Sequence, residues 1–195
     1  MAYRVAVAVS GRGSNLFALV DALAADPVAQ VGLVLSDRDA EALSHAESRG
    51  IATHRLQDYH DGAEWLAALA ASGADLLVLA GYLKLVPPEV VQAMPGRIMN
   101  IHPALLPHHG GRGMYGRRVH EAVLAAGDTV SGATVHLVDE VFDRGTILAQ
   151  MRVPVLAGDT AALLADRVLA AEHRLLPAAV IAAARAGFPV PCALD

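Results

Sequence analysis

The sequence predicts an α/β fold: a Rossmann-like, open and mostly parallel sheet with helices on both faces and an antiparallel addition of C-terminal strands. Two observations support this prediction. Short apolar runs alternate with longer segments of helical periodicity in the first hundred or so residues, and most of these runs are continuously apolar. Strands without polar alternation are buried on both faces, which is typical of parallel sheets covered by helices.

The first part of the chain contains four predicted strands separated by three predicted helices. The strands are expected at residues 5–9, 31–35, 51–54 and 75–80, and the helices at 15–25, 40–49 and 63–71. Strands that alternate with helices favour right-handed crossover connections, as in Rossmann-like sheets.

The pattern changes after residue 100. A glycine-rich loop leads to a helix near residues 117–125, and strands at 132–138 and 146–153 follow, joined by a short acidic turn that favours antiparallel pairing. A long helix begins near Thr160, and Pro177 is expected to kink or interrupt it because proline lacks a backbone donor. No linker divides the chain, so we expect residues 1–195 to form a single domain.

Composition excludes several classes of protein. With 54% hydrophobic and 18% charged residues the chain is not disordered, and its net charge of −5 gives no general attraction to nucleic acid. The single cysteine, Cys192, excludes an internal disulfide framework, and no apolar run is long enough for a membrane span or a secretory signal. We therefore expect a cytoplasmic monomer or homodimer that acts on small molecules, with no nucleic-acid or membrane partner.

The turn Ser10-Gly11-Arg12-Gly13-Ser14-Asn15 is the first candidate site, because ligands of open α/β sheets bind at the carboxyl ends of strands. Glycines allow a tight turn, and free N–H groups at a helix N-terminus suit a phosphate. Ser14 or Asn15 could instead cap an ordinary turn. Leu16 replaces the third glycine of a dinucleotide fingerprint, so a single phosphate fits better, although Asp37 could serve a ribose.

Asn100-Ile101-His102-Pro103 is the second candidate, at the end of an apolar strand. Alternation puts Asn100 and His102 on one side, where an amide can polarise a carbonyl and an imidazole can stabilise an oxyanion. The third candidate is the acidic turn 139–145. Asp143, if the turn folds back onto His102, would raise the pKa of the imidazole. A structural histidine and a solvated hairpin turn remain the alternatives.

Three segments together resemble phosphoribosylglycinamide formyltransferases, a branch of the folate-dependent formyltransferase family. They are Gly11-x-Gly13-Ser14-Asn15-Leu16, Asn100-Ile101-His102-Pro103-Ala104-Leu105-Leu106-Pro107, and His136 followed by Asp143-x-Gly145-x-Ile147. The likeness runs from about residue 5 to about residue 177. The wider family shares the Asn-x-His and Asp set, and the Gly-Ser-Asn turn singles out this branch.

The resemblance implies that 10-formyltetrahydrofolate, as co-substrate, gives its formyl group to the amine of glycinamide ribonucleotide in purine synthesis. Asn100 and His102 would bind the formyl oxygen, and Asp143 would hold His102 protonated and help to remove the amine proton through water. The implied substrate-binding residues are Gly13, Ser14, Asn15, Leu16, Phe17 and Glu172; the implied folate-binding residues are Leu83, Lys84, Leu85, Val86 and Asn100. Without the resemblance, residues 83–86 would be interpreted as core.

Glu172 falls on the apolar stripe of the last helix, in line with Val168 and Leu175, where a carboxylate needs a partner. A salt bridge to an arginine is the alternative to substrate contact. Three features depart from the family. The loop 107–116 is longer and richer in glycine, and residues 59–62 lack the arginine expected to meet the folate tail. Lys84 stands where an arginine is common in the pterin segment. His102, His108, His109 and His120 have no accompanying ligand pattern, so no metal is expected.

Three other functions are open to such a sequence. A methionyl-tRNA formyltransferase would need a C-terminal RNA-binding domain, and a formyltetrahydrofolate hydrolase would need an N-terminal regulatory domain; with 195 residues we expect neither. A nucleotide-binding oxidoreductase using the turn at residues 11–15 and Asp37 is the alternative from a different class. NAD binding, measured against the binding of a folate analogue, would separate these possibilities.

Overall fold

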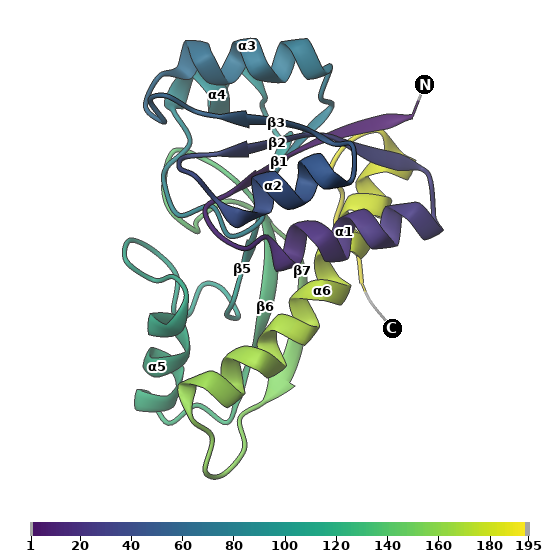
Figure 1. Cartoon of the computed structure of the whole chain (residues 1–195). Coiled ribbons are helices and arrows are strands. Elements are labelled where there is room, and N and C mark those ends of the chain that lie inside the picture. The colour runs from purple at the N-terminus through teal and green to yellow at the C-terminus, as the bar shows by residue number, and fades with distance from the viewer. Residues whose placement is uncertain (1, 194–195) are drawn as a thin grey trace.

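A seven-stranded sheet in the order β3-β2-β1-β4-β5-β6-β7 forms the centre of the computed structural model, which describes residues 2–193 (Figure 1). The strands are β1 (Tyr3–Val9), β2 (Ala29–Ser36), β3 (Ala52–Arg55), β4 (Leu76–Leu79), β5 (Ile98–His102), β6 (Val130–Leu137) and β7 (Ile147–Pro154). Strands β1 to β5 are parallel, whereas β6 pairs antiparallel with both β5 and β7. The predicted fold class is confirmed.

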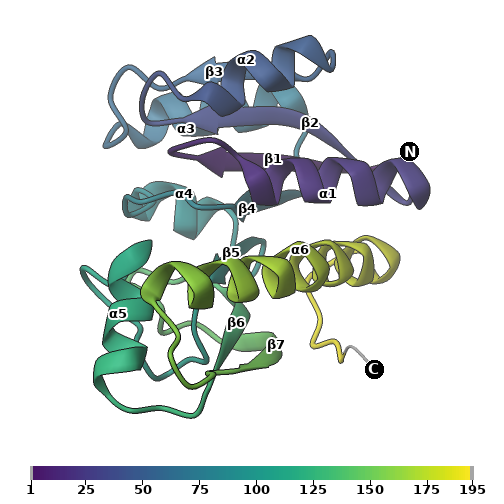
Figure 2. The same cartoon turned by 60° about the horizontal axis from the view of Figure 1, so that its bottom comes forward.

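Six helices cover the two faces of this sheet (Figure 2). They are α1 (Ser14–Ala25), α2 (Glu41–Ser48), α3 (Gly62–Ser72), α4 (Pro88–Ala93), α5 (Arg117–Ala125) and α6 (Ala161–Ala186). No helix within residues 2–193 is both long enough and apolar enough to cross a membrane.

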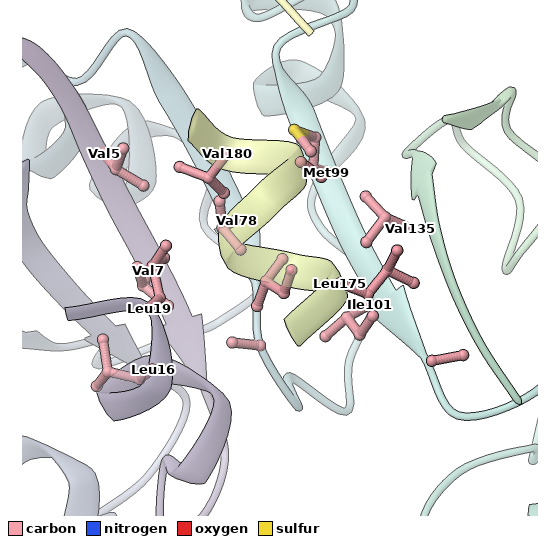
Figure 3. Close-up of a cluster of buried hydrophobic side chains, with 14 of the residues drawn as sticks. Val5, Val7, Leu16, Leu19, Val78, Met99, Ile101, Val135, Leu175 and Val180 are labelled. Atoms are coloured by element: carbon pink, nitrogen blue, oxygen red, sulfur yellow. The ribbon is translucent and has the colours of Figure 1, made fainter. Parts of the chain in front are cut away.

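Alternate residues of β1 belong to two separate cores. Val5 and Val7 pack under α1 and α6, together with side chains from β4, β5 and β6 (Figure 3). Ala6 and Ala8 face the opposite side, where Trp65 of α3 is fully buried. Burial on both faces explains why the strands are apolar throughout, and it leaves the carboxyl ends of the strands free to carry polar side chains.

The expected interruption of the last helix at Pro177 is wrong. Helix α6 continues through this proline, and eleven of its residues are buried. A proline inside a helix costs about 3 kcal/mol, which burial of a long apolar face outweighs. Helix α4 was not predicted at all, because six residues are too few to show a helical period. It begins with Pro88, a residue well suited to the first turn of a helix.

Candidate active site

A cleft of about 1420 Å³ opens at the carboxyl ends of β1, β4 and β5. It is lined by the turn after β1, the segment after β4, the end of β5, residues 111–118, the β6–β7 connection and the first half of α6. Single-ligand pockets measure roughly 300–1000 Å³, so this cleft has room for two small molecules.

Asn100, His136 and Asp143 form a hydrogen-bonded cluster at the centre of the cleft. Asn100 on β5 lies opposite His136 on β6 in the antiparallel register. His136 Nδ1 donates to the Leu137 carbonyl at 2.7 Å, so its Nε2 accepts from Asn100 Nδ2 at 3.0 Å. The same Nδ2 also lies 3.5 Å from Asp143 Oδ1. The NH₂ group of Asn100 is therefore occupied by these two neighbours, and its carbonyl oxygen is the free end.

His102 lies on the same face of β5 as Asn100 and is 3% exposed. Its Nδ1 is 3.6 Å from Asp143 Oδ2, and its Nε2 donates to the His109 carbonyl at 2.9 Å. Burial lowers the pKa of His102 below its usual value, although Asp143 and the His109 carbonyl act to raise it. The expectation that Asp143 holds the pKa of His102 up is therefore wrong for the net shift, because burial has the larger effect.

Asp143 has the left-handed backbone conformation, with φ of 56°, within the β6–β7 connection. This turn brings the carboxylate back onto His102 and lets Oδ2 accept from the Gly111 N–H at 2.8 Å. Burial acts to raise the pKa of Asp143, but its contacts with His136, His102 and Gly111 outweigh burial and hold the pKa below its usual value. Asp143 is thus ionised at neutral pH, while its turn neighbours Asp139 and Glu140 are exposed to solvent.

Gly13 shapes the turn between β1 and α1. Its φ is 79°, and a Cβ atom there would lie 2.7 Å from the Cβ of Ala42, so only glycine fits. The N–H groups of Ser14, Asn15 and Leu16 come first in the helix and have no intrahelical acceptor, as anion binding requires. The Phe17 N–H instead donates to the Gly13 carbonyl at 3.0 Å.

The structure adds three details to the predicted phosphate site. The Leu16 side chain is fully buried, so this residue can offer only its N–H group. The Phe17 ring packs beneath Arg49, 4.8 Å from its guanidinium carbon, and its N–H is already bonded. Neither Ser14 nor Asn15 caps α1, because both lie inside the helix and Gly13 occupies the cap position.

Asn15 of α1 and Glu172 of α6 are bonded to each other in the lining of the cleft. Asn15 Nδ2 donates to Glu172 Oε2 at 2.7 Å, and Asn15 Oδ1 is buried without a hydrogen-bond partner among residues 2–193. Burial raises the pKa of Glu172 to about 7, opposed by the bond from Asn15. Asparagine, rather than the arginine considered from the sequence, is therefore the partner that this buried carboxylate has.

Residues 83–86 line the cleft and do not belong to the core as a unit. Leu83 and Leu85 are 38% and 46% exposed, whereas Val86 is 6% exposed and packs against the second core. Lys84 Nζ lies 4.9 Å from the centre of the Tyr59 ring, and Tyr59 also lines the cleft. The segment therefore presents apolar side chains and a cation to a ligand.

Asp37 cannot serve a ribose in this structure. Its side chain is 2% exposed, and Oδ2 accepts two hydrogen bonds from Arg38, at 2.6 and 3.1 Å. Dinucleotide binding requires an accessible acidic residue, and the burial of Asp37 removes it. It also requires a third glycine, and that position holds the buried Leu16.

Residues 3–180 match the sequence profile described as formyl transferase. The chain belongs to the formyl transferase family. It is 45% identical over 181 residues to a chloroplastic phosphoribosylglycinamide formyltransferase of Arabidopsis thaliana, which covers 88% of this chain and 62% of the relative. It is 42% identical over 193 residues to phosphoribosylglycinamide formyltransferase of Mycobacterium tuberculosis. This match covers 96% of this chain and 87% of the relative. The chain thus spans 62% of the length of the Arabidopsis relative.

Solved structures agree with the sequence relationship of this formyl transferase. The crystal structure of glycinamide ribonucleotide transformylase 1 from Symbiobacterium toebii superimposes with a TM-score of 0.87 at 38% identity, covering 95% of this chain and 89% of that one. Phosphoribosylglycinamide formyltransferase from Brucella melitensis gives a TM-score of 0.84 at 43% identity, covering 94% and 96%.

Two buried histidines of this formyl transferase carry no predicted role. His136 is 2% exposed and bridges Asn100 and Asp143; only the antiparallel register with β5 reveals that contact. His120 of α5 lines the cleft, and its Nδ1 has no partner within residues 2–193. Burial, and then His102, lowers the pKa of His120. No group of three or more possible metal ligands occurs among the described residues of this family member.

The raised pKa of Glu172 predicts a change in stability with pH. Between about pH 4.5 and pH 7 the folded formyl transferase keeps a proton that the unfolded chain releases, so its free energy of unfolding falls as the pH rises. Between about pH 5 and about pH 8 this fall in the free energy of unfolding should be on the order of 2–3 kcal/mol, and Glu172→Gln should abolish it. Urea unfolding at the two pH values measures the difference. Glu121→Gln, at an exposed position, is the control. Equal pH dependence in Glu172→Gln and the unmodified protein would contradict the prediction.

Proposed function

We propose that this formyl transferase transfers the formyl group of 10-formyltetrahydrofolate to the amine of glycinamide ribonucleotide, a reaction of purine synthesis. The observation that carries the proposal is the cluster of Asn100, His102 and Asp143 in a cleft large enough for two substrates. Relatives that match most of this chain are phosphoribosylglycinamide formyltransferases, which supports the choice of acceptor. Another folate-dependent formyltransferase or a hydrolase remains the alternative.

The reaction requires a group that stabilises negative charge on the formyl oxygen. The amine attacks the formyl carbon, a new carbon–nitrogen bond forms, and the bond from that carbon to N10 of the folate breaks. The amine loses one proton, which in our proposal Asp143 helps to remove through water, and N10 of the leaving tetrahydrofolate takes up one proton. In our proposal His102 Nε2 donates to the oxygen of the tetrahedral intermediate. That oxygen takes the place of the His109 carbonyl as the acceptor of the His102 hydrogen bond. Asp143 stays ionised and favours the charged imidazole as negative charge develops nearby.

Asn100 can assist only if its NH₂ group faces the substrate. With neutral His136 that group is bonded to His136 Nε2. His136 Nε2 and Asp143 Oδ1 hold the amide in the orientation seen here, so the amide must turn when it binds the formyl oxygen. We infer that His136 sets the orientation of Asn100 in the absence of substrate.

The other contacts follow from the shape of the cleft. The N–H groups of Ser14, Asn15 and Leu16 would hold the phosphate of glycinamide ribonucleotide, and Glu172 would accept from its polar groups. Residues 83–86 would receive the pterin between exposed leucines. The co-substrate role of 10-formyltetrahydrofolate, the absence of a metal, a cytoplasmic location and a monomeric or homodimeric state remain predictions.

One assay tests the proposed function. The purified protein is mixed with glycinamide ribonucleotide and 10-formyltetrahydrofolate, and release of tetrahydrofolate is followed. We expect release that depends on both substrates. Equal release without glycinamide ribonucleotide would indicate a hydrolase. If the protein binds NAD and releases no tetrahydrofolate with either substrate present, the proposal is wrong.

The turn before α1 predicts a split between the two Michaelis constants. Asn15→Leu should raise the KM for glycinamide ribonucleotide on the order of tenfold and leave the KM for the folate nearly unchanged, because Asn15 Nδ2 holds the Glu172 carboxylate that would contact the ribonucleotide. Gln30→Leu, at an exposed position on β2, is the control. A changed KM for the folate alone would show that the two pockets are assigned the wrong way round.

A further inference from the structure

Ser10, directly after β1, makes two hydrogen bonds to the segment after β4. The residue is 8% exposed and has no part in the cluster around His102. Its N–H donates to the Gly81 carbonyl at 3.2 Å, and its Oγ accepts from the Leu83 N–H at 3.0 Å. The two bonds hold both sides of a turn in which Gly81 has a φ of 78°. The first residue of the segment 83–86 is thus fixed by a side chain more than 70 positions earlier.

The segment 83–86 depends on this anchor because its side chains provide little else. Leu83 and Leu85 are exposed in the cleft, and Val86 alone is buried in the core. Lys84 contacts Tyr59, which is itself on the rim of the cleft. A backbone with so little core packing opens locally unless its hydrogen bonds hold it.

We propose that Ser10 is a positioning residue for the segment 83–86. The inference rests on the proposed function, in which this segment receives the pterin. A segment already held in its bound shape loses less conformational entropy when the ligand binds. Loss of the anchor weakens binding of the folate and leaves binding of the ribonucleotide unaffected.

The test compares Ser10→Ala with Ser131→Ala in the full chain. Ser131 is a matched control, because it is 2% exposed and its hydroxyl has no partner among the described residues. Two quantities are measured: the hydrogen-exchange rates of the amides of residues 83–86, and the Kd values for a 5-deaza analogue of tetrahydrofolate and for glycinamide ribonucleotide. In Ser10→Ala we expect faster exchange and a folate Kd raised about tenfold, with the other Kd unchanged.

Unchanged exchange in Ser10→Ala overturns the anchor, and faster exchange with an unchanged folate Kd overturns its role in folate binding. Equal rises in both Kd values would show a general loss of structure and also overturn the proposal. Failure of the proposed function gives a different result: the unmodified protein then does not bind the folate analogue, while the exchange rates still report on the anchor.

Discussion

His102→Ala is expected to lower kcat by at least about a hundredfold while the protein stays folded. The reason is that the charge on the formyl oxygen develops only in the transition state, where the donor on His102 is needed most. Removing the imidazole leaves the His109 carbonyl without its donor, but that loop lies at the cleft and outside both cores. Steady-state kinetics and a thermal unfolding curve measure the two effects.

A second variant separates chemistry from folding at this buried position. His102→Gln keeps a hydrogen-bond donor of similar length but cannot take up a proton, so we expect it to retain the fold and to stay strongly impaired. His45→Ala, on the exposed side of α2, is the control and should keep its kcat. Turnover near that of the unmodified protein in His102→Ala would remove His102 from the mechanism.

Asp143→Asn should lower activity on the order of a hundredfold at neutral pH. Asparagine keeps the size of the side chain and can still accept from the Gly111 N–H, but it removes the negative charge beside His102. Burial already lowers the pKa of His102, and Asp143 opposes that shift. Without the carboxylate the pKa falls further, so the part of the residual rate that follows His102 ionisation should move to lower pH.

Two neighbours in the same turn are the controls for Asp143→Asn. Asp139→Asn and Glu140→Gln alter exposed residues and should do much less. The measurement is a pH–rate profile of all three variants beside the unmodified protein. If Asp143→Asn is fully active and Glu140→Gln is inactive, the acidic turn has been assigned in the wrong register. Full activity in all three variants would show that this turn has no catalytic role.

Most of the sheet could be predicted from the sequence because burial on both faces leaves a local record, the continuous apolar run. The helices that cover it were equally visible from their period, apart from α4, whose six residues are too short to show one. Pro177 shows where local rules fail. Its effect on α6 depends on how much of that helix is buried, and burial is a property of the folded chain.

The candidate site was predictable in its members and less so in its electrostatics. Asn100 and His102 could be expected on one face of the same strand, whereas the return of Asp143 onto His102 depends on the conformation of the turn after β6. The contact of His136 with Asn100 exists only through the register of β5 and β6, which no spacing encodes. The direction of the His102 pKa shift depends on whether burial or the Asp143 carboxylate has the larger effect. Neither the degree of burial nor the distance to the carboxylate can be obtained from the sequence.

The bond between Asn15 and Glu172 joins residues 157 positions apart, and this separation matters during synthesis of the protein. Helix α6 covers the apolar face of β1, β4 and β5 (Figure 3), yet it is made long after those strands. A ribosome adds roughly 5–20 residues per second, so the valines on this face of the strands stay exposed to solvent for seconds before α6 is synthesised. We expect the nascent chain to need a chaperone in that interval and to acquire ligand affinity only when α6 docks.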